Sequence, residues 1–334
     1  MQRAKILRGI GVAIISFWGM TVLATPTTAQ TQGASFPERP ITLVVGFSPG
    51  GSNDVTARVI APELSRLFRV PVLVENRVGA AGTIATNYVA KSNPDGYTLV
   101  VTSASPLVLA PHTTDNIPYD TMRDLAGITL LGVTPEVLAL SPRIAASNLG
   151  ELVGLAQTRD VSLASAGSGG LPHLAIELFR STAPGARILH VPYKGAAPAV
   201  TDALAGHVDG VVVDLPAVQA HIRAGRLRGL AVANERRSEF LPDIPTSGEQ
   251  GRPAFIAVNW LALAAPARTP PLVLERLRGA LVEVMQVRSV KDALAEAGVE
   301  VQLSQDRPEF QRFMAAEYEK WGGIARAANV RSTD

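Results

Sequence analysis

The chain has 334 residues, of which 47% are hydrophobic and 18% are charged, and it contains no cysteine. This composition excludes a disordered chain, and the length favours two globular units over one. The lack of cysteine excludes disulfide bonds and a lipid anchor on cysteine. The formal net charge of +2 gives no reason to expect binding to nucleic acid or to an anionic membrane surface.

The first 29 residues have the pattern of a signal peptide. Three basic residues precede an uncharged, largely apolar run over 10–24, and small residues follow up to Ala29. This pattern predicts cleavage near Ala29 and export to the periplasm. The alternative is a membrane anchor, but a spanning helix needs about 20 apolar residues, and Pro26 ends this run early. Without the segment, 28 basic residues stand against 29 acidic ones, a net charge of −1.

Strand and helix patterns alternate along the first part of the mature chain. An apolar, β-branched run at 41–45 predicts a buried strand, and a glycine-rich turn follows it. Helix, strand, helix and strand are then expected at 54–68, 70–74, 79–91 and 97–102. Because helices separate the strands, this order predicts a parallel, doubly wound sheet.

The same alternation returns in the second half of the chain. A short strand at 161–165 precedes another glycine-rich turn, and a helix is expected over 172–181. Strand, helix and strand follow at 187–191, 196–205 and 208–213. The sequence therefore predicts an α/β protein with two lobes, each a mainly parallel sheet with flanking helices.

Two apolar segments, 137–140 and 258–263, are expected to cross between the lobes. We expect the first domain to comprise 36–138 plus 260–334, and the second 139–259. The tail over 271–328 is helical and amphipathic and is expected to pack on the first lobe. Two crossing segments form a hinge, and ligands bind where two α/β lobes face each other.

The loop from Gly46 to Asp54 follows the first predicted strand and opens a helix. Ligands of open α/β sheets bind at this end of a strand. The unpaired N–H groups and the dipole of a helix start favour an anion. The alternative is an ordinary tight turn. We expect Asp54 to turn away from the ligand and to hold the loop by accepting N–H bonds.

The same loop matches G-x-S-x-G, the nucleophile elbow of α/β-hydrolases, with Ser48 as the serine. The elbow uses the backbone N–H of the residue after the serine in its oxyanion hole. Here that residue is Pro49, which has no N–H. This difference argues against catalysis by Ser48.

The second glycine-rich loop runs from Ser165 to Gly170 and precedes a helix that starts near Pro172. A dinucleotide fingerprint would need glycine or alanine at 172, and neither loop ends in the Gly-Lys-Ser/Thr of a P-loop. What remains is an anion-accepting helix start, with the hydroxyl groups of Ser165 and Ser168 as donors. His173 at the helix entry is either a packing or capping residue or a ligand contact.

Other polar residues near the expected cleft carry weaker signals. Lys194 is a carboxylate partner or a surface lysine, and the sequence does not decide whether Tyr193 packs or hydrogen-bonds. Ser103, Ala104 and Ser105 follow the third predicted strand. The histidines lack metal-ligand spacing and the acidic residues show no catalytic pairing, so no metal or cofactor is expected.

Together these segments resemble the Bug family, the solute receptors of tripartite tricarboxylate transporters. The matching motifs occur in order over about 290 residues, which makes the combination specific although each motif alone is weak. They are Phe36–Pro40, Pro49–Asp54, Val74–Arg77 with Gly79 and Gly82, Pro94–Thr98, Ser165–Gly167 with His173, His190–Gly195, Leu204–Asp209, Leu241–Thr246 and Lys320–Trp321.

The resemblance implies a Venus-flytrap periplasmic-binding-protein fold, without catalysis or metal. It implies that the two glycine-rich loops grip a ligand carboxylate, partly through water, and that the partner is a tripartite permease. Ligands in the family include dicarboxylates, acidic amino acids, citrate-like acids and aromatic carboxylates. The expected ligand-binding residues are Phe47, Ser48, Pro49, Gly50, Gly51, Ser52, Asn53, Asp54, Ser103, Ala104, Ser165, Ala166, Gly167, Ser168, Gly169, Gly170, His173, Tyr193, Lys194 and Asp214.

The chain departs from the family pattern in ways that bear on the ligand. Gly170 stands where the family often has a hydroxyl or amide side chain, and Leu171 and Pro172 stand where serines are frequent. The stretch 103–109 is more apolar than in many members. With fewer side-chain donors, a monocarboxylate or a partly apolar ligand is expected rather than a tricarboxylate.

Three hypotheses follow from the sequence. The leading one is a monomeric receptor that captures a carboxylate by closing two lobes and delivers it to a permease. The second is a serine hydrolase that uses Ser48. The third is a receptor that passes the ligand signal to a signalling protein instead of a permease.

Overall fold

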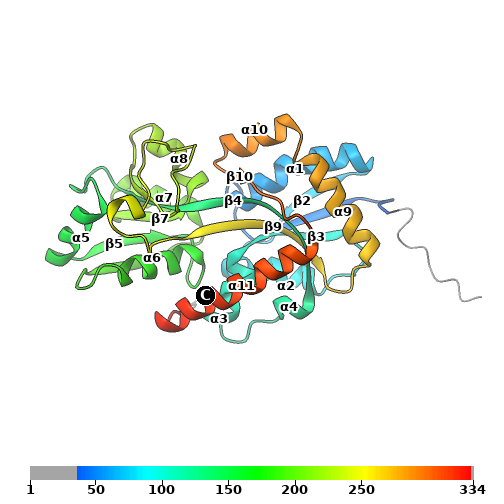
Figure 1. The fold of residues 1–334 in the computed structure, drawn as a ribbon, viewed down its shortest axis with the longest axis horizontal. Helices are drawn as coiled ribbons and strands as arrows, with labels where there is room; N and C mark the ends of the chain where they lie inside the picture. Colours follow the sequence, from blue (N-terminus) through cyan, green and yellow to red (C-terminus); the bar gives the residue numbers. More distant parts are fainter. Residues whose placement is uncertain (1–35, 332–334) are drawn as a thin grey trace, which may run out of the picture.

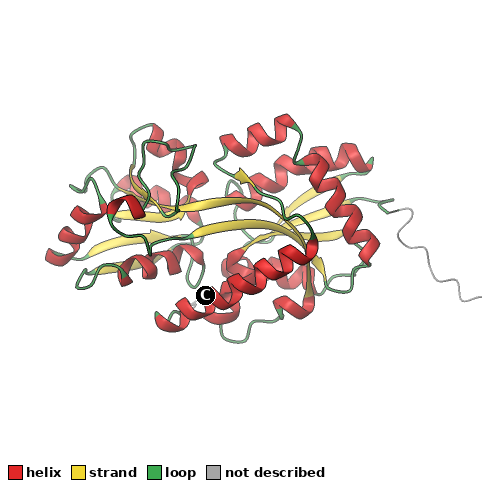
Figure 2. Cartoon of the chain, in the orientation of Figure 1, coloured by secondary structure: helices red, strands yellow, loops and turns green. Residues whose placement is uncertain are grey.

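The computed structural model describes residues 36–331, so the predicted signal peptide lies outside the described residues. The described chain forms two α/β lobes that lie side by side along the long axis of the molecule (Figure 1). Two strands, β4 and β9, run from one lobe into the other (Figure 2). This arrangement is the two-lobed fold that the sequence predicts.

The first lobe is built on three parallel strands with β1 between its two partners. The strands are β1 (Ile41–Val45), β2 (Val72–Asn76) and β3 (Thr98–Ser103), and the helices between them are α1 (Ser52–Phe68), η1 (Ala80–Gly82) and α2 (Thr83–Ala90). The predicted β-α-β-α-β order is therefore confirmed. Apolar side chains from β1, α1 and two later helices, α9 (Pro271–Val284) and α10 (Arg288–Glu296), form its core.

The second lobe repeats this design, with β5 parallel to both of its neighbours. Its strands are β5 (Val161–Ser165), β6 (Ile188–Pro192) and β7 (Gly210–Asp214), with β8 (Arg228–Val232) paired to β4. Its helices are α5 (Leu149–Thr158), α6 (Leu171–Ser181), α7 (Ala196–Ala205), α8 (Leu215–Arg223) and the short η3 (Gly248–Gln250). The glycine-rich loops of both lobes thus lie between a parallel strand and a helix, as the sequence indicates.

The two crossing strands are β4 (Leu125–Leu140) and β9 (Val258–Pro266), which pair antiparallel. β3 pairs with β9 and β7 pairs with β4, so the sheet continues through both lobes in the order β2-β1-β3-β9-β4-β7-β5-β6. The predicted crossing segments lie within these strands, but β4 begins twelve residues before the expected Val137. Nearly every residue of β4 is buried, so the period-two alternation that reveals a half-exposed strand is missing.

The last long helix, α11 (Arg307–Ala327), joins the two lobes from one side. We expected the tail to pack on the first lobe, and α9 and α10 do contact α1 there. Helix α11 also contacts α6 of the second lobe. It covers the short helices η2 (Ser105–Leu109) and α3 (Ala110–Thr113); α4 (Thr121–Asp124) and β10 (Glu300–Val301) complete the described elements.

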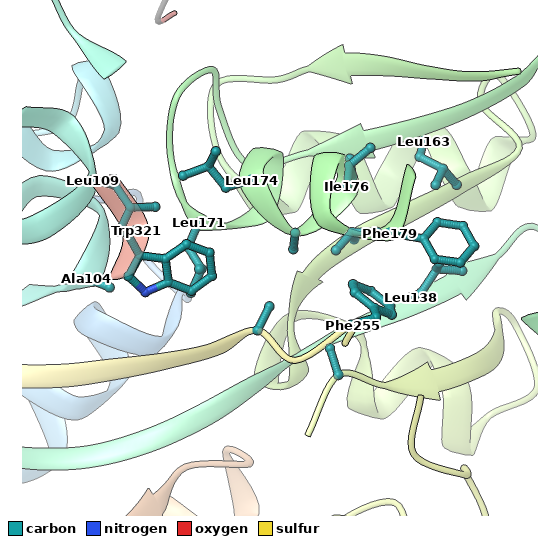
Figure 3. Close-up of a cluster of buried hydrophobic side chains, with 14 of the residues drawn as sticks. Ala104, Leu109, Leu138, Leu163, Leu171, Leu174, Ile176, Phe179, Phe255 and Trp321 are labelled. Carbon is teal, nitrogen blue, oxygen red and sulfur yellow. The ribbon is translucent and has the colours of Figure 1, made fainter. Parts of the chain in front are cut away.

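A hydrophobic cluster at the junction explains the position of α11. Trp321 from α11 lies near Leu109 of η2 and Leu171 of α6 in Figure 3. Farther along α6, Phe179 packs against Phe255 with ring centroids 5.2 Å apart. The same cluster therefore contains side chains from both lobes, and it holds them together on the side of α11.

Among residues 36–331, no helix combines the length and the apolar character needed to cross a membrane.

Candidate functional site

A cavity of about 330 Å³ lies between the two lobes. Its size is in the usual range for small-molecule sites. Both lobes and the crossing strand β9 contribute to its wall. The lining residues are Phe47, Ser48, Pro49, Gly50, Gly51, Ser52, Asn53, Ala81, Ser103, Ser105, Ala166, Gly170, Pro172, Gly195, Ala196, Ala197, Val200, Thr201, Leu204, Asp214, Pro216, Ala217, His221 and Asn259.

Apart from the short η2, four helices of the described chain begin on this wall: α1, α6, α7 and α8. Their N-cap residues are Gly51, Gly170, Gly195 and Asp214, and none of these caps its helix with a side-chain hydrogen bond. The first N–H groups of a helix have no acceptor within the helix, and each N-terminus carries about half a positive charge. The cavity therefore offers positive potential and N–H donors from both lobes.

The loop before α1 is held in shape by the buried carboxylate of Asp54. This carboxylate accepts hydrogen bonds from Gly50 N at 3.0 Å, from Asn76 Nδ2 at 2.8 Å and from Arg58 Nε at 2.9 Å. Burial alone would raise the pKa of Asp54, but these hydrogen bonds and the Arg58 charge outweigh it and lower the pKa. Asp54 is not among the residues that line the cavity, and its carboxylate accepts N–H bonds from the loop.

The loop before α6 is braced from behind by two histidines. Ser165 Oγ donates to Gly167 O at 2.8 Å and therefore accepts from His190 Nε2, 2.6 Å away. His173 Nδ1 accepts from Gly169 N at 3.0 Å, and its ring stacks on His190 with centroids 3.7 Å apart. Burial, aided by His173 and Arg180, lowers the pKa of His190 to about 3, so the ring stays neutral.

Contacts across the cleft show that the lobes are closed on the cavity. Ser52 Oγ from the first lobe donates to Asp214 Oδ2 of the second at 2.5 Å. Leu171 N at the start of α6 donates to Ser105 Oγ at 3.1 Å. A β-carbon on Gly195 would lie 3.5 Å from Ser48 Oγ, so the loops of the two lobes touch there as well.

A second carboxyl group lies behind Asp214. Glu136 on β4 is directly opposite Asp214 on β7 in the strand register, and its side chain is completely buried. Burial first, and then the nearby Asp214 carboxylate, raise the pKa of Glu136 well above its ordinary value. Asp214 also accepts a hydrogen bond from Asn259 Nδ2 at 2.9 Å. Glu136 is therefore the protonated member of a carboxyl pair.

The remaining wall is largely apolar and contains no lysine or arginine among the described residues. Val200 and Leu204 of α7, together with Ala217 of α8, form an apolar surface in the second lobe. No group of three or more potential metal ligands occurs in residues 36–331. The arrangement suits a small organic anion held by backbone donors.

The structure places eleven of the twenty expected residues on the cavity wall: Phe47, Ser48, Pro49, Gly50, Gly51, Ser52, Asn53, Ser103, Ala166, Gly170 and Asp214. The other nine do not line it: Asp54, Ala104, Ser165, Gly167, Ser168, Gly169, His173, Tyr193 and Lys194. Lys194 is exposed to solvent, and Tyr193 Oη donates to Asp202 Oδ2 at 2.6 Å.

The sequence analysis missed the wall residues that belong to α7, α8 and β9. Val200 and Leu204 occur at helical spacing, which is also the pattern of ordinary core residues. Asn259 stands alone in an apolar run, and His221 belongs to no recognisable motif. The one available signal was Gly195 before a predicted helix, which repeats the glycine-rich helix starts of the two identified loops.

The fold and the cavity between the lobes together define a two-lobed solute-binding protein. The model of the tripartite tricarboxylate transporter family receptor matches residues 56–330. Protein BugT of Bordetella pertussis is 37% identical over 335 residues, which cover 99% of each chain. The chain therefore belongs to the tripartite tricarboxylate transporter receptor family, as the sequence motifs indicated.

Two solved structures illustrate the likeness. Rpa4515 of R. palustris with adipate has 30% identity and a TM-score of 0.84, covering 89% of this chain and 99% of that one. MatC (Rpa3494) of Rhodopseudomonas palustris with bound malate has 27% identity and a TM-score of 0.81, covering 86% of this chain and 99% of that one. The chain thus has the fold of periplasmic solute-binding proteins.

Proposed function

We propose that this protein captures a small organic carboxylate in the cavity between its lobes and delivers it to a tripartite tricarboxylate-type permease. The observation that carries the proposal is the convergence of four helix N-termini, without side-chain caps, on one closed cavity. Such N-termini bind carboxylates and phosphates through their free N–H groups. The adipate and malate in the two related structures support the same ligand class.

Capture proceeds by closure of the lobes. A carboxylate between α1 and the helices of the second lobe receives donors from both sides, so it binds the closed form more tightly than the open one. We assign the lobes to 36–138 plus 260–334 and to 139–259, with β4 and β9 as the hinge. The mature protein acts as a monomer in the periplasm after cleavage near Ala29.

Isothermal titration with a panel of mono- and dicarboxylates tests this proposal. The protein is first unfolded in denaturant, dialysed and refolded, so that any ligand carried from the cell is removed. We expect at least one acid to bind and to raise the melting temperature further with each tenfold increase in its concentration above Kd. The proposal fails if no carboxylate binds the refolded protein.

We infer that the cavity is a binding site and not a hydrolase active site. Ser48 lines the cavity, but Pro49 supplies no N–H for an oxyanion hole. In the described part of the chain, Ser48 has no hydrogen bond to a histidine that could act as a base. An esterase assay with Ser48→Ala as control decides the question, because turnover by the wild type that disappears in the variant would establish catalysis.

A further inference from the structure

We propose that Asp214 and Asn259 form an acceptor subsite that selects a ligand carrying an N–H or O–H group and rejects a second carboxylate. This inference rests on the proposed function, because it assumes that a carboxylate occupies the cavity. It narrows the ligand class to a monocarboxylate with a hydrogen-bond donor, such as an amino acid or a hydroxy acid.

Asp214 and Asn259 are both polar residues on the cavity wall. Asp214 lines the cavity at the start of α8, and no side-chain hydrogen bond links it to the N-terminus of that helix. Asn259 donates its amide N–H to Asp214, and its own amide oxygen has no hydrogen-bond partner among the described residues. Asn259 is only 5% exposed. An unpaired acceptor this deeply buried is costly, and a donor on the ligand would relieve the cost.

Asp214 is also an acidic side chain on the cavity wall. Ser52 and Asn259 both donate to Asp214 Oδ2. Glu136 has no donor directed at it and faces Asp214 from a fully buried position. Burial and the nearby Asp214 carboxylate both favour the protonated, neutral form of Glu136. The acidic group on the cavity wall is therefore that of Asp214, with a neutral Glu136 behind it.

The wall also lacks a basic side chain that could pair with Asp214, because no lysine or arginine of the described chain lines the cavity. His221 is the other titratable group on the wall, and burial lowers its pKa, which favours the neutral ring. A second ligand carboxylate near Asp214 would therefore meet a like charge in a poorly solvated site. An ammonium or hydroxyl group would instead donate to it.

Titration calorimetry with matched acids tests the selectivity of the wild-type protein. The probes are butanoate, its 2-, 3- and 4-amino and hydroxy derivatives, and succinate, together with the same set built on hexanoate with adipate as the diacid. A charged hydrogen bond strengthens binding by about tenfold to a hundredfold. We expect at least one amino or hydroxy acid to bind tenfold or more tightly than its parent acid. The inference is overturned if no derivative gains tenfold or if the diacid is the tightest ligand of its set.

A charge-removing variant and its matched control locate the effect. Asp214→Asn should reduce the preference for the amino acid over its parent and strengthen diacid binding. Asp243→Asn, an exposed aspartate distant from the cavity wall, should keep the wild-type ranking. If Asp214→Asn does not fold, the wild-type ranking alone decides. Binding with the wrong ranking overturns only this inference, whereas absence of binding by every acid overturns the proposed function as well.

Discussion

Replacing Glu136 by glutamine should make the protein more stable at neutral pH. Glu136 is completely buried, and burial together with the charge of Asp214 raises its pKa well above the ordinary value. A glutamine has nearly the same shape and does not titrate. Its amide N–H can donate to Asp214 in place of the proton that Glu136 holds. The substitution therefore removes a proton-dependent cost and leaves the packing of β4 against β7 in place.

The magnitude follows from proton linkage. In the unfolded chain a glutamate loses its proton near pH 4.3, whereas folded Glu136 keeps it to a higher pH. Between these two pH values, unfolding releases one proton, so the free energy of unfolding falls by about 1.4 kcal/mol per pH unit. The stability linked to the proton on Glu136 is fully present below the pKa of a glutamate in the unfolded chain. It is lost as the pH rises toward the pKa of folded Glu136. The loss amounts to about 1.4 kcal/mol for each pH unit up to the pKa of folded Glu136, and Glu136→Gln should not show it.

Urea unfolding of both proteins at pH 5, 6, 7 and 8, followed by circular dichroism, measures this difference. The gap in stability between Glu136→Gln and wild type should widen with pH until Glu136 ionises in the folded state. Glu235→Gln, an exposed glutamate with no side-chain partner among the hydrogen bonds described, serves as control and should follow the wild type. Parallel pH profiles for Glu136→Gln and wild type would refute the assignment of the proton to Glu136.

Three further substitutions probe the cleft and its supports. Ser52→Ala removes the hydrogen bond to Asp214 across the cleft and should weaken ligand affinity about two- to tenfold by calorimetry, whereas unchanged affinity would show that this contact does not stabilise closure. Gly46→Ala places a β-carbon 2.6 Å from the Cα of Gly82, so the melting temperature should fall by an amount that corresponds to about 1–3 kcal/mol; a wild-type value would contradict this packing. Glu317→Ala leaves the indole N–H groups of two buried tryptophans without their acceptor. The free energy of unfolding measured in urea should fall by about 2–4 kcal/mol, whereas the Glu317→Gln variant should retain most of the wild-type value.

Local sequence signals were sufficient to predict the parallel sheets and the two glycine-rich loops. An apolar run predicts the strand at Ile41–Val45, and the glycine and proline residues after it predict the loop before α1. Both signals depend only on residues that are close together in the sequence. The anion-accepting character of these loops also follows locally, because it depends on backbone groups at a helix start.

The remaining parts of the site depend on contacts between residues distant in sequence. His190 supports Ser165 across 25 residues, and Glu136 meets Asp214 only through the register of β4 and β7. Neither pairing has a sequence motif. The apolar positions of α7 were indistinguishable from core positions, because a cavity wall and a core place the same side chains at the same spacing. Only the packing of the lobes decides which of them face the ligand.

The paired arrangement of β4 and β9 limits how the lobes can separate. An antiparallel ladder resists sliding, because a shift of one residue would break its hydrogen bonds and unpack the side chains that are buried on both faces of the two strands. Rotation about the paired strands β4 and β9 is less costly, because bending and twisting the pair preserve the hydrogen bonds between the two strands. The two lobes should therefore separate by rotation about the paired strands β4 and β9. A single hinge angle then describes how far the cleft has opened.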